Sequence, residues 1–329
     1  MAKQPAWDVD TATLGGFAET FEAVVLNVGR VLQGKEDATR LALVCLASQG
    51  HLLLEDVPGV GKTSLAKALA RSFGLEWKRI QFTPDLLPSD VTGASVYDRD
   101  RGTFTFRPGS VFANVVLADE INRASPKTQS ALLEAMQEGQ VTVDNVTHIL
   151  PDPFLVIATQ NPVEHEGTYP LPESQLDRFL LRVRMGYPDR SAEVTMLEMV
   201  GSAPAPDTLP VVATPDAIPA MVRFTDEVHV ASSLKGYIVD LAAATRSHPA
   251  LALGMSPRAV LALQRAARAL AASRGREYVI PDDLKTVAGP VLEHRLVLSP
   301  EAAISGIDVR EVLADVFRSV PVPSGRSGP

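Results

Sequence analysis

The 329-residue sequence has a single cysteine and few aromatic residues. With Cys45 alone, no disulfide can form within the chain, and a metal site built from several cysteines is excluded. Aromatic residues make up 5% of the chain and hydrophobic residues 46%, which favours helix-rich cores packed by alanine, leucine and valine over an all-β domain. This usage of cysteine fits a reducing compartment.

Long apolar runs and an excess of positive charge are also absent. The longest apolar stretch, residues 41–47, is far shorter than the roughly 18 residues that a membrane-spanning helix needs. The polar residues 1–16 lack the apolar centre of a secretory signal. Acidic residues number 39 against 31 lysines and arginines, and the net charge of −8 argues against a surface devoted to nucleic acid. We therefore expect a soluble, cytoplasmic protein.

The first half of the chain alternates short apolar runs with helical patterns. This alternation is typical of a parallel sheet with crossover helices, and therefore predicts an α/β fold. The expected strands are Leu52–Glu55, 79–82, Val115–Asp119, 154–159 and 180–184. The clearest helices are 63–73 and Pro126–Glu138. Residues 95–107 and 140–150 are expected to form two inserted hairpins.

The pattern changes after residue 188. A linker is marked by Pro204, Pro206, Pro210, Pro215 and Pro219. Helical patterns without strands follow at Ser232–Ser247, 256–274 and 281–294. We therefore divide the chain into an αβα core with a five-stranded parallel sheet (1–188), a smaller all-helical lid domain (189–320) and a flexible tail (321–329).

A glycine-rich loop follows the first expected strand. Its sequence is DVPGVGKT, residues 56–63, and a helical pattern begins directly after it. Glycines let successive backbone N–H groups converge on phosphate oxygens in front of a helix N-terminus. Lys62 is expected to bridge the phosphates and the Thr63 hydroxyl to bind Mg²⁺. The residues expected around the nucleotide are Asp56, Pro58, Gly59, Val60, Gly61, Lys62, Thr63 and Ser64.

The strict form of this motif begins with glycine, and this chain has Asp56 at that position. The alternative interpretation is a turn that merely connects a strand and a helix. The strand before it, the helix after it and the Gly-Lys-Thr sequence together favour the phosphate loop.

Two acidic residues end the strand Val115–Asp119. Removal of a γ-phosphate requires a metal near the phosphates and a base that orients water. We expect Asp119 to bind Mg²⁺, directly or through water, and Glu120 to polarise the attacking water. The alternative is that these are solvated acids at an ordinary strand end. The phosphate loop upstream favours the catalytic interpretation over this alternative. Asn161, after the next strand, could hydrogen-bond the γ-phosphate or the water.

With these pieces in order, the chain closely resembles the MoxR family of AAA+ ATPases. The matching strings are LLLEDVPGVGKT, LADEINRASPKTQSALLEAMQE, VIATQNP and LPESQLDRFL, and the resemblance spans residues 34–295. The two hairpins resemble the helix-2 insert and the pre-sensor-1 hairpin of the AAA+ branch that includes magnesium chelatase subunits and MCM helicases.

The resemblance implies roles for three further residues. Asn161 is similar to sensor 1, and Arg178 to the arginine finger that reaches the γ-phosphate of a neighbouring subunit. A structural ion pair of Arg178 with Asp177 or Glu173 is the alternative. Arg258 is similar to sensor 2, in cis or in trans, and the alternative is an arginine that simply opens an exposed helix.

The resemblance also implies a function. It implies ATP hydrolysis with ATP and Mg²⁺ as ligands. The enzyme is expected to be a homo-oligomeric ring, a hexamer, that remodels, matures or activates client proteins. A partner with a von Willebrand factor A domain is implied as well. A nucleic-acid motor is the first alternative, but hairpin 140–150 carries no lysine or arginine for a phosphate backbone. A nucleotide-switched scaffold is the second, and it would lack the catalytic carboxylate that Glu120 supplies.

Overall fold

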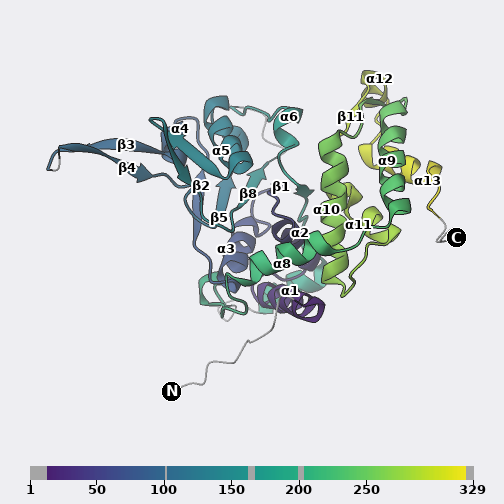
Figure 1. The fold of residues 1–329 in the computed structure, drawn as a ribbon, viewed down its shortest axis with the longest axis horizontal. Coiled ribbons are helices and arrows are strands. Elements are labelled where there is room, and N and C mark those ends of the chain that lie inside the picture. Colours follow the sequence, from purple (N-terminus) through teal and green to yellow (C-terminus); the bar gives the residue numbers. More distant parts are fainter. Residues whose placement is uncertain (1–12, 101, 162–166, 199–203, 324–329) are drawn as a thin grey trace, which may run out of the picture.

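The computed structural model describes residues 13–100, 102–161, 167–198 and 204–323 (Figure 1). Most of the polar N-terminal segment, Arg101 in the first hairpin turn and residues 324–329 of the expected tail lie outside these ranges. Within them, no helix is both long enough and apolar enough to cross a bilayer.

The centre of the molecule is a parallel sheet of five strands in the order β2-β5-β8-β1-β9. The bounds are β1 Leu52–Glu55, β2 Trp77–Gln81, β5 Val115–Asp119, β8 Leu155–Gln160 and β9 Leu181–Val183. The predicted α/β fold is confirmed, and every predicted strand is present with its ends within two residues of the prediction. All the polar carboxyl ends of these strands therefore lie along one edge of the sheet.

Side chains alternate across the sheet and build a core on each face. Leu52 and Leu54 of β1 belong to one buried cluster and Leu53 to the other. On the face of Leu52, the covering helices are α1 Leu14–Gly29, α2 Glu36–Ala47 and α3 Lys62–Ser72. On the face of Leu53 they are α4 Pro88–Thr92, η1 Ile121–Arg123 and α5 Pro126–Glu138.

Helices dominate the chain after the sheet. Their bounds are α6 Glu173–Leu176, α7 Arg190–Glu198, η2 Pro206–Thr208, α8 Ala217–Glu227, α9 Ser232–Ser247, α10 Pro257–Ser273, α11 Pro281–Leu292, α12 Pro300–Ile304 and α13 Val309–Ser319. A short antiparallel ribbon of β10 Leu251–Leu253 and β11 Val297–Leu298 interrupts them, which the sequence did not predict. Helix α10 begins at Pro257 because the Ser256 hydroxyl accepts the N–H of Ala259 at 3.1 Å.

The lid helices pack directly on the core. Helix α10 contacts both α1 and α2, and α8 contacts α2. One apolar cluster runs continuously from Phe17 of α1 to Leu263 of α10. The predicted boundary at residue 188 stays a prediction, and buried contacts join the helices on its two sides.

Two hairpins extend from the sheet, as predicted. The first is β3 Gly93–Asp98 with β4 Thr103–Pro108, and the second is β6 Gln140–Val143 with β7 Val146–Ile149. Figure 1 shows the first hairpin projecting from the core on the side away from the lid helices. The second turns at Asp144 and Asn145, whose φ angles of 50° and 62° are those of a tight hairpin turn.

Candidate functional site

The loop between β1 and α3 has the conformation expected of a phosphate loop. Gly59 and Gly61 have φ angles of 85° and 99°, a region that side chains disfavour. At Gly61 a Cβ atom would also lie 2.5 Å from Leu32 Cδ1. Gly61 is the N-cap of α3, so the backbone N–H groups of the first helical turn face the loop. Both glycines are therefore required by the backbone path.

Asp56, the departure from the strict motif, is bound to the backbone. Its carboxylate accepts the N–H of Val57 at 2.9 Å and that of Gly186 at 2.5 Å. The buried Lys35 donates to the carbonyl groups of Met185 and Gly186 at 2.9 Å each. The carboxylate thus fixes the start of the loop to the segment that leaves β9, which a glycine at this position could not do.

One cavity of about 370 Å³ collects most of the predicted site. It is lined by Pro58, Gly59, Gly61, Lys62, Thr63, Ser64, Arg79, Asp119, Glu120 and Asn161. We call this the phosphate-loop cavity. The predicted residues Asp56 and Val60 are not among its lining: Asp56 bonds to backbone amides, and Val60 packs in the apolar core with 7% of its surface exposed. The Lys62 ammonium group donates to the Asp56 carbonyl at 2.7 Å.

The acidic pair is held by neighbouring strands. The Thr159 hydroxyl of β8 donates to Asp119 at 2.6 Å and accepts the backbone N–H of Glu120 at 2.8 Å. Arg79 of β2 forms an ion pair with the other oxygen of Asp119. Asp119 therefore has a fixed rotamer that faces the cavity.

Glu120 lies in the left-handed region, with φ 56° and ψ 50°. This conformation is uncommon for a residue with a side chain, and such residues cluster at functional sites. The Glu120 carboxylate accepts from Gln81 Nε2 at 2.8 Å and from Arg123 at 3.0 Å. Its oxygens are thereby held in one orientation where Glu120 lines the cavity.

Sequence reasoning missed Arg79, Gln81 and Thr159. Arg79 and Gln81 are polar residues two positions apart on a strand that pairs with β5, and Gln81 lies opposite Asp119 in the register. The alternation of polar Arg79 and Gln81 around an apolar residue, at the end of the strand that precedes the acidic pair, could have indicated that both face the site. Thr159 gave no comparable signal, because its partners become neighbours only through the pairing of β5 and β8.

Oxygen groups in the phosphate-loop cavity suit a magnesium ion. The Thr63 hydroxyl and the Asp119 carboxylate line the same cavity. Among the described residues there is no group of three or more histidine, cysteine or acidic side chains that could form a metal cage. Magnesium that is bound with a nucleotide usually takes one or two protein oxygens together with phosphates and water. The two donors fit that pattern.

Arg178 and Arg258 lie elsewhere, in a second cavity of about 500 Å³ that we call the arginine cavity. Its lining includes residues 48–51, which lead into β1, and Leu180, which precedes β9. The arginine cavity therefore lies at the amino ends of the strands, opposite the phosphate loop. Parallel strands advance about 3.3 Å per residue, so β1 alone separates the two edges by roughly 13 Å.

The contacts of these arginines are specific. One N–H of Arg178 donates to the Leu133 carbonyl of α5 at 2.8 Å. Arg258 lies 4.0 Å from Asp177, and half of its side chain is exposed. The structure thus brings Arg178 and Arg258 together and separates both from the phosphate loop of the same chain.

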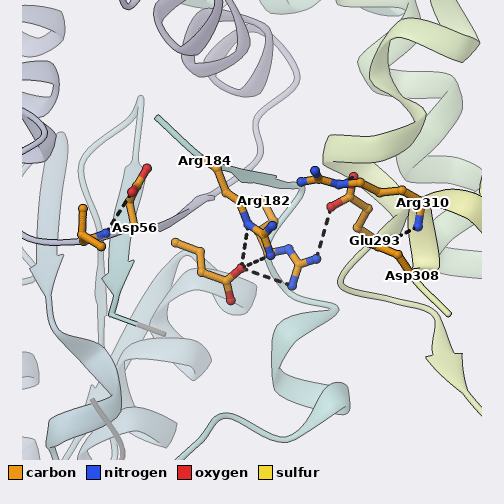
Figure 2. Close-up of polar contacts among 8 residues, drawn as sticks. Asp56, Arg182, Arg184, Glu293, Asp308 and Arg310 are labelled. Carbon is orange, nitrogen blue, oxygen red and sulfur yellow. Dashed lines mark hydrogen bonds and ion pairs between the residues drawn. The ribbon is translucent and has the colours of Figure 1, made fainter. Parts of the chain in front are cut away.

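Ion pairs connect the phosphate-loop strand to the lid (Figure 2). Glu55, the last residue of β1, pairs with Arg184 at 3.0 Å and with Arg182 at 3.6 Å. Arg182 also contacts Glu293 at 3.4 Å, and Glu293 pairs with Arg310 of α13 at 3.0 Å. The carboxylates of Glu55 and Glu293 are mostly buried, so bulk water screens these pairs less than surface pairs.

Comparisons with known proteins agree with this architecture. Residues 51–181 match the ATPase family associated with various cellular activities (AAA), and residues 243–316 match the AAA lid domain. The uncharacterized protein YeaC of Bacillus subtilis (strain 168) is 53% identical over 92% of this chain and 95% of its own length. Chaperone MoxR1 of Mycobacterium tuberculosis is 43% identical over 96% of this chain and 86% of its own.

A solved structure is similar over the whole fold. It is the crystal structure of a presumed ATPase from Cytophaga hutchinsonii, 39% identical, with a TM-score of 0.88. The match covers 94% of this chain and 97% of that chain.

Proposed function

The chain belongs to the MoxR family of AAA+ ATPases, and from this premise we propose that it binds ATP with Mg²⁺ in the phosphate-loop cavity and uses hydrolysis to remodel client proteins. One observation carries the proposal. A single cavity collects a lysine, a threonine hydroxyl, two adjacent carboxylates and an asparagine amide. These are the groups that phosphoryl transfer to water requires.

Each group has a distinct task in this proposal. The backbone N–H groups at the start of α3 and the Lys62 ammonium group hold the phosphates. Thr63 and Asp119 hold Mg²⁺, which when bound neutralises charge on the phosphate oxygens. Glu120 accepts a hydrogen bond from the attacking water and orients it. Asn161, as sensor 1, contacts the γ-phosphate or the same water.

We further propose that Arg178 and Arg258 act on the nucleotide of a neighbouring subunit. Both lie at the amino edge of the sheet, while the phosphate loop of their own chain lies at the carboxyl edge. In a ring of identical subunits with head-to-tail contacts, the arginine cavity of one subunit can face the phosphate-loop cavity of the next. This favours action in trans for both arginines in a closed ring, which we propose to be a hexamer.

Remodelling of clients is the purpose we assign to hydrolysis. A relative over nearly the whole chain, from Mycobacterium tuberculosis, bears the name chaperone MoxR1. Buried contacts between α10 and the core helices give the lid a path to transmit nucleotide-dependent motion. A partner with a von Willebrand factor A domain would present the client to the ring.

Subunit mixing tests the shared active site. Arg178→Ala subunits retain an intact phosphate-loop cavity, and Glu120→Gln subunits retain an intact arginine. We expect each variant to be nearly inactive alone and their mixture to recover ATPase activity. A mixture no more active than its components would remove the trans assignment.

The client role needs its own experiment. Glu120→Gln subunits with ATP should assemble without turning over, so proteins cross-linked to that ring can be identified. A captured protein counts as a client only if its activity or conformation then changes with wild-type protein and ATP but not with Glu120→Gln. If no captured protein responds in this way, the remodelling proposal fails while the ATPase assignment stands.

A nucleic-acid motor is the competing function, and the hairpin β6–β7 does not favour it. The strands and turn contain no lysine or arginine, and the turn carries Asp144. Binding of DNA that weakens with salt in proportion to several phosphate contacts would revive this alternative.

A further inference from the structure

Three consecutive residues after α11 join the lid to the core. Glu293 contacts Arg182 of β9, and His294 Nε2 hydrogen-bonds the Phe179 carbonyl at 3.0 Å. Arg295 reaches the residues between α6 and β9, the short segment 177–180 that contains Arg178. All three contacts therefore fall on β9 or on the four residues before it.

Arg295 uses all five N–H donors of its guanidinium group. Nε donates to the Asp177 carboxylate at 2.6 Å, and the two terminal nitrogens donate to the carbonyl groups of Asp177 at 3.2 Å, Phe179 at 2.7 Å and Leu180 at 3.0 Å. The fifth bond goes to the Val291 carbonyl in the last turn of α11. One planar group thus ties the backbone on both sides of Arg178 to a lid helix.

The guanidinium group of Arg295 is buried, with 3% of its side chain exposed. Burial lowers the pKa of Arg295, and the hydrogen bond that Arg295 donates to Asp177 acts in the opposite direction. A buried cation with a full set of acceptors is expensive to move, because any displacement leaves donors unsatisfied. Segment 177–180 is therefore held firmly to the end of α11.

None of the hydrogen bonds of Arg295 involves the side chain of Arg178. Its side chain is half-buried, and one N–H contacts the Leu133 carbonyl of α5. Arg258 lies on the other side of Asp177, 4.0 Å from its second carboxylate oxygen. Asp177 consequently stands between a buried arginine that fixes it and an exposed arginine that faces the arginine cavity.

We propose that Arg295 is a positioning residue for Arg178: its five hydrogen bonds set the backbone from which Arg178 extends towards the nucleotide of the neighbouring subunit. The inference rests on the proposed function, since it takes Arg178 to act in trans. A lysine at this position cannot substitute, because an ammonium group lacks the planar fork that reaches several carbonyl groups at once.

The test uses Arg295→Lys in the full chain. We expect kcat to fall about ten- to a hundredfold, the size of loss that follows from misplacing a catalytic group by an ångström. The KM for ATP and the affinity for a fluorescent ADP analogue should stay within about twofold, since the phosphate-loop cavity is at the other edge of the sheet. Arg318→Lys, at an exposed site of α13, is the matched control and should leave kcat unchanged.

Mixing Arg295→Lys with Glu120→Gln subunits distinguishes a positioning role of Arg295 from a general role in folding. Arg295→Lys subunits have a working phosphate-loop cavity, and Glu120→Gln subunits have a correctly placed Arg178. In a 1:1 mixture, roughly a quarter of all contacts pair the two in the productive order, so the activity should recover to roughly a quarter of the wild-type rate. If Arg295 only keeps its own subunit folded, no recovery occurs.

Two further arms keep the result decisive. The mixture of Arg178→Ala with Glu120→Gln reports on the shared site itself. If this mixture regains activity and the mixture with Arg295→Lys does not, only the positioning role is overturned. If neither mixture regains activity, both proposals are overturned. Asp177→Ala, which removes the acceptor of Nε, is run in the same assay in case Arg295→Lys does not fold. It should show the same fall in kcat with an unchanged KM, and a wild-type kcat would contradict the inference.

Discussion

The Thr159 hydroxyl lies 2.6 Å from the Asp119 carboxylate and donates a hydrogen bond to it. The same hydroxyl accepts the backbone N–H of Glu120, so one buried atom positions both the carboxylate of Asp119 and the backbone of Glu120. Asn161 follows Thr159 by two residues. The strand that carries the acidic pair and the strand that leads to Asn161 are therefore linked at the cavity.

Replacing Thr159 with valine, which has the same shape without the hydroxyl, tests that link. The Glu120 N–H would lose its acceptor, which costs about 1–3 kcal/mol for a buried donor. We expect a comparable loss in the free energy of unfolding by urea and a fall in kcat of about tenfold or more, as for a displaced catalytic base. Thr159→Ser retains the hydroxyl, and its kcat should stay close to that of the wild type; equal losses in both variants would show that packing matters instead.

Asp56→Gly restores the strict form of the phosphate-loop motif, yet we expect it to be harmful. The variant loses the acceptor of the Val57 and Gly186 N–H groups. We predict that the affinity for a fluorescent ADP analogue falls about five- to thirtyfold, equivalent to about 1–2 kcal/mol of loop ordering. Asp56→Asn keeps one carbonyl acceptor, and its affinity for the analogue should lie between those of the wild type and Asp56→Gly. Tighter binding by the glycine variant would mean that the aspartate has no structural role.

The success of sequence reasoning depended on how local each feature is. The phosphate loop and Asp119–Glu120 are continuous strings, in which a strand, a turn and a helix determine each other within a dozen residues. Arg79 and Thr159 reach the same cavity from different strands, and only the sheet order β2-β5-β8 makes them neighbours of Asp119. The contact of Arg295 with segment 177–180 spans more than a hundred residues and depends on how the lid packs.

The same reasoning holds for the fold. Helix α1 was not predicted, although Phe17, Phe21, Val24 and Val28 recur at helical spacing and are all buried. The ribbon β10–β11 has strands of three and two residues, too short to leave any periodicity. The assignments of Asn161, Arg178 and Arg258 stay predictions, for which the structure supplies positions and the mixing experiments supply tests.

If Arg178 and Arg258 act in trans, a lone subunit is incomplete. We expect ATPase activity per subunit to rise with protein concentration and to reach a plateau when the ring is saturated, because assembly follows mass action. Turnover measured alongside sedimentation should show both curves rising together. A specific activity that is constant across the dissociated range would mean that each chain hydrolyses ATP alone.

Acid should destabilise the core through His51. This buried histidine donates from Nε2 to the Met136 carbonyl and accepts the Val156 N–H at Nδ1, so it must be neutral in the folded protein. Burial lowers its pKa to about 4 from 6.5. The unfolded chain therefore takes up a proton first as the pH falls below about 6.5, and folding stability decreases down to about pH 4, by about 3 kcal/mol from this residue.

Unfolding in urea between pH 7.5 and 4.5 measures this effect. His51→Gln removes the titrating group, so its stability should depend less steeply on pH, although its stability at neutral pH should be lower. The exposed His229→Gln is the control and should follow the wild-type slope. An unchanged slope in His51→Gln would assign the acid sensitivity to other groups, such as the buried His294, whose pKa is also lowered by burial.

The left-handed backbone of Glu120 has a consequence for engineering. A residue with a side chain is held there at a cost of about 1–3 kcal/mol, which glycine would largely avoid. Selection of this protein for heat resistance alone would therefore favour glycine at position 120 and discard the carboxylate. Thermostable variants of this ATPase must be screened for turnover at every round, because stability favours glycine at position 120 and ATP hydrolysis is expected to need the carboxylate.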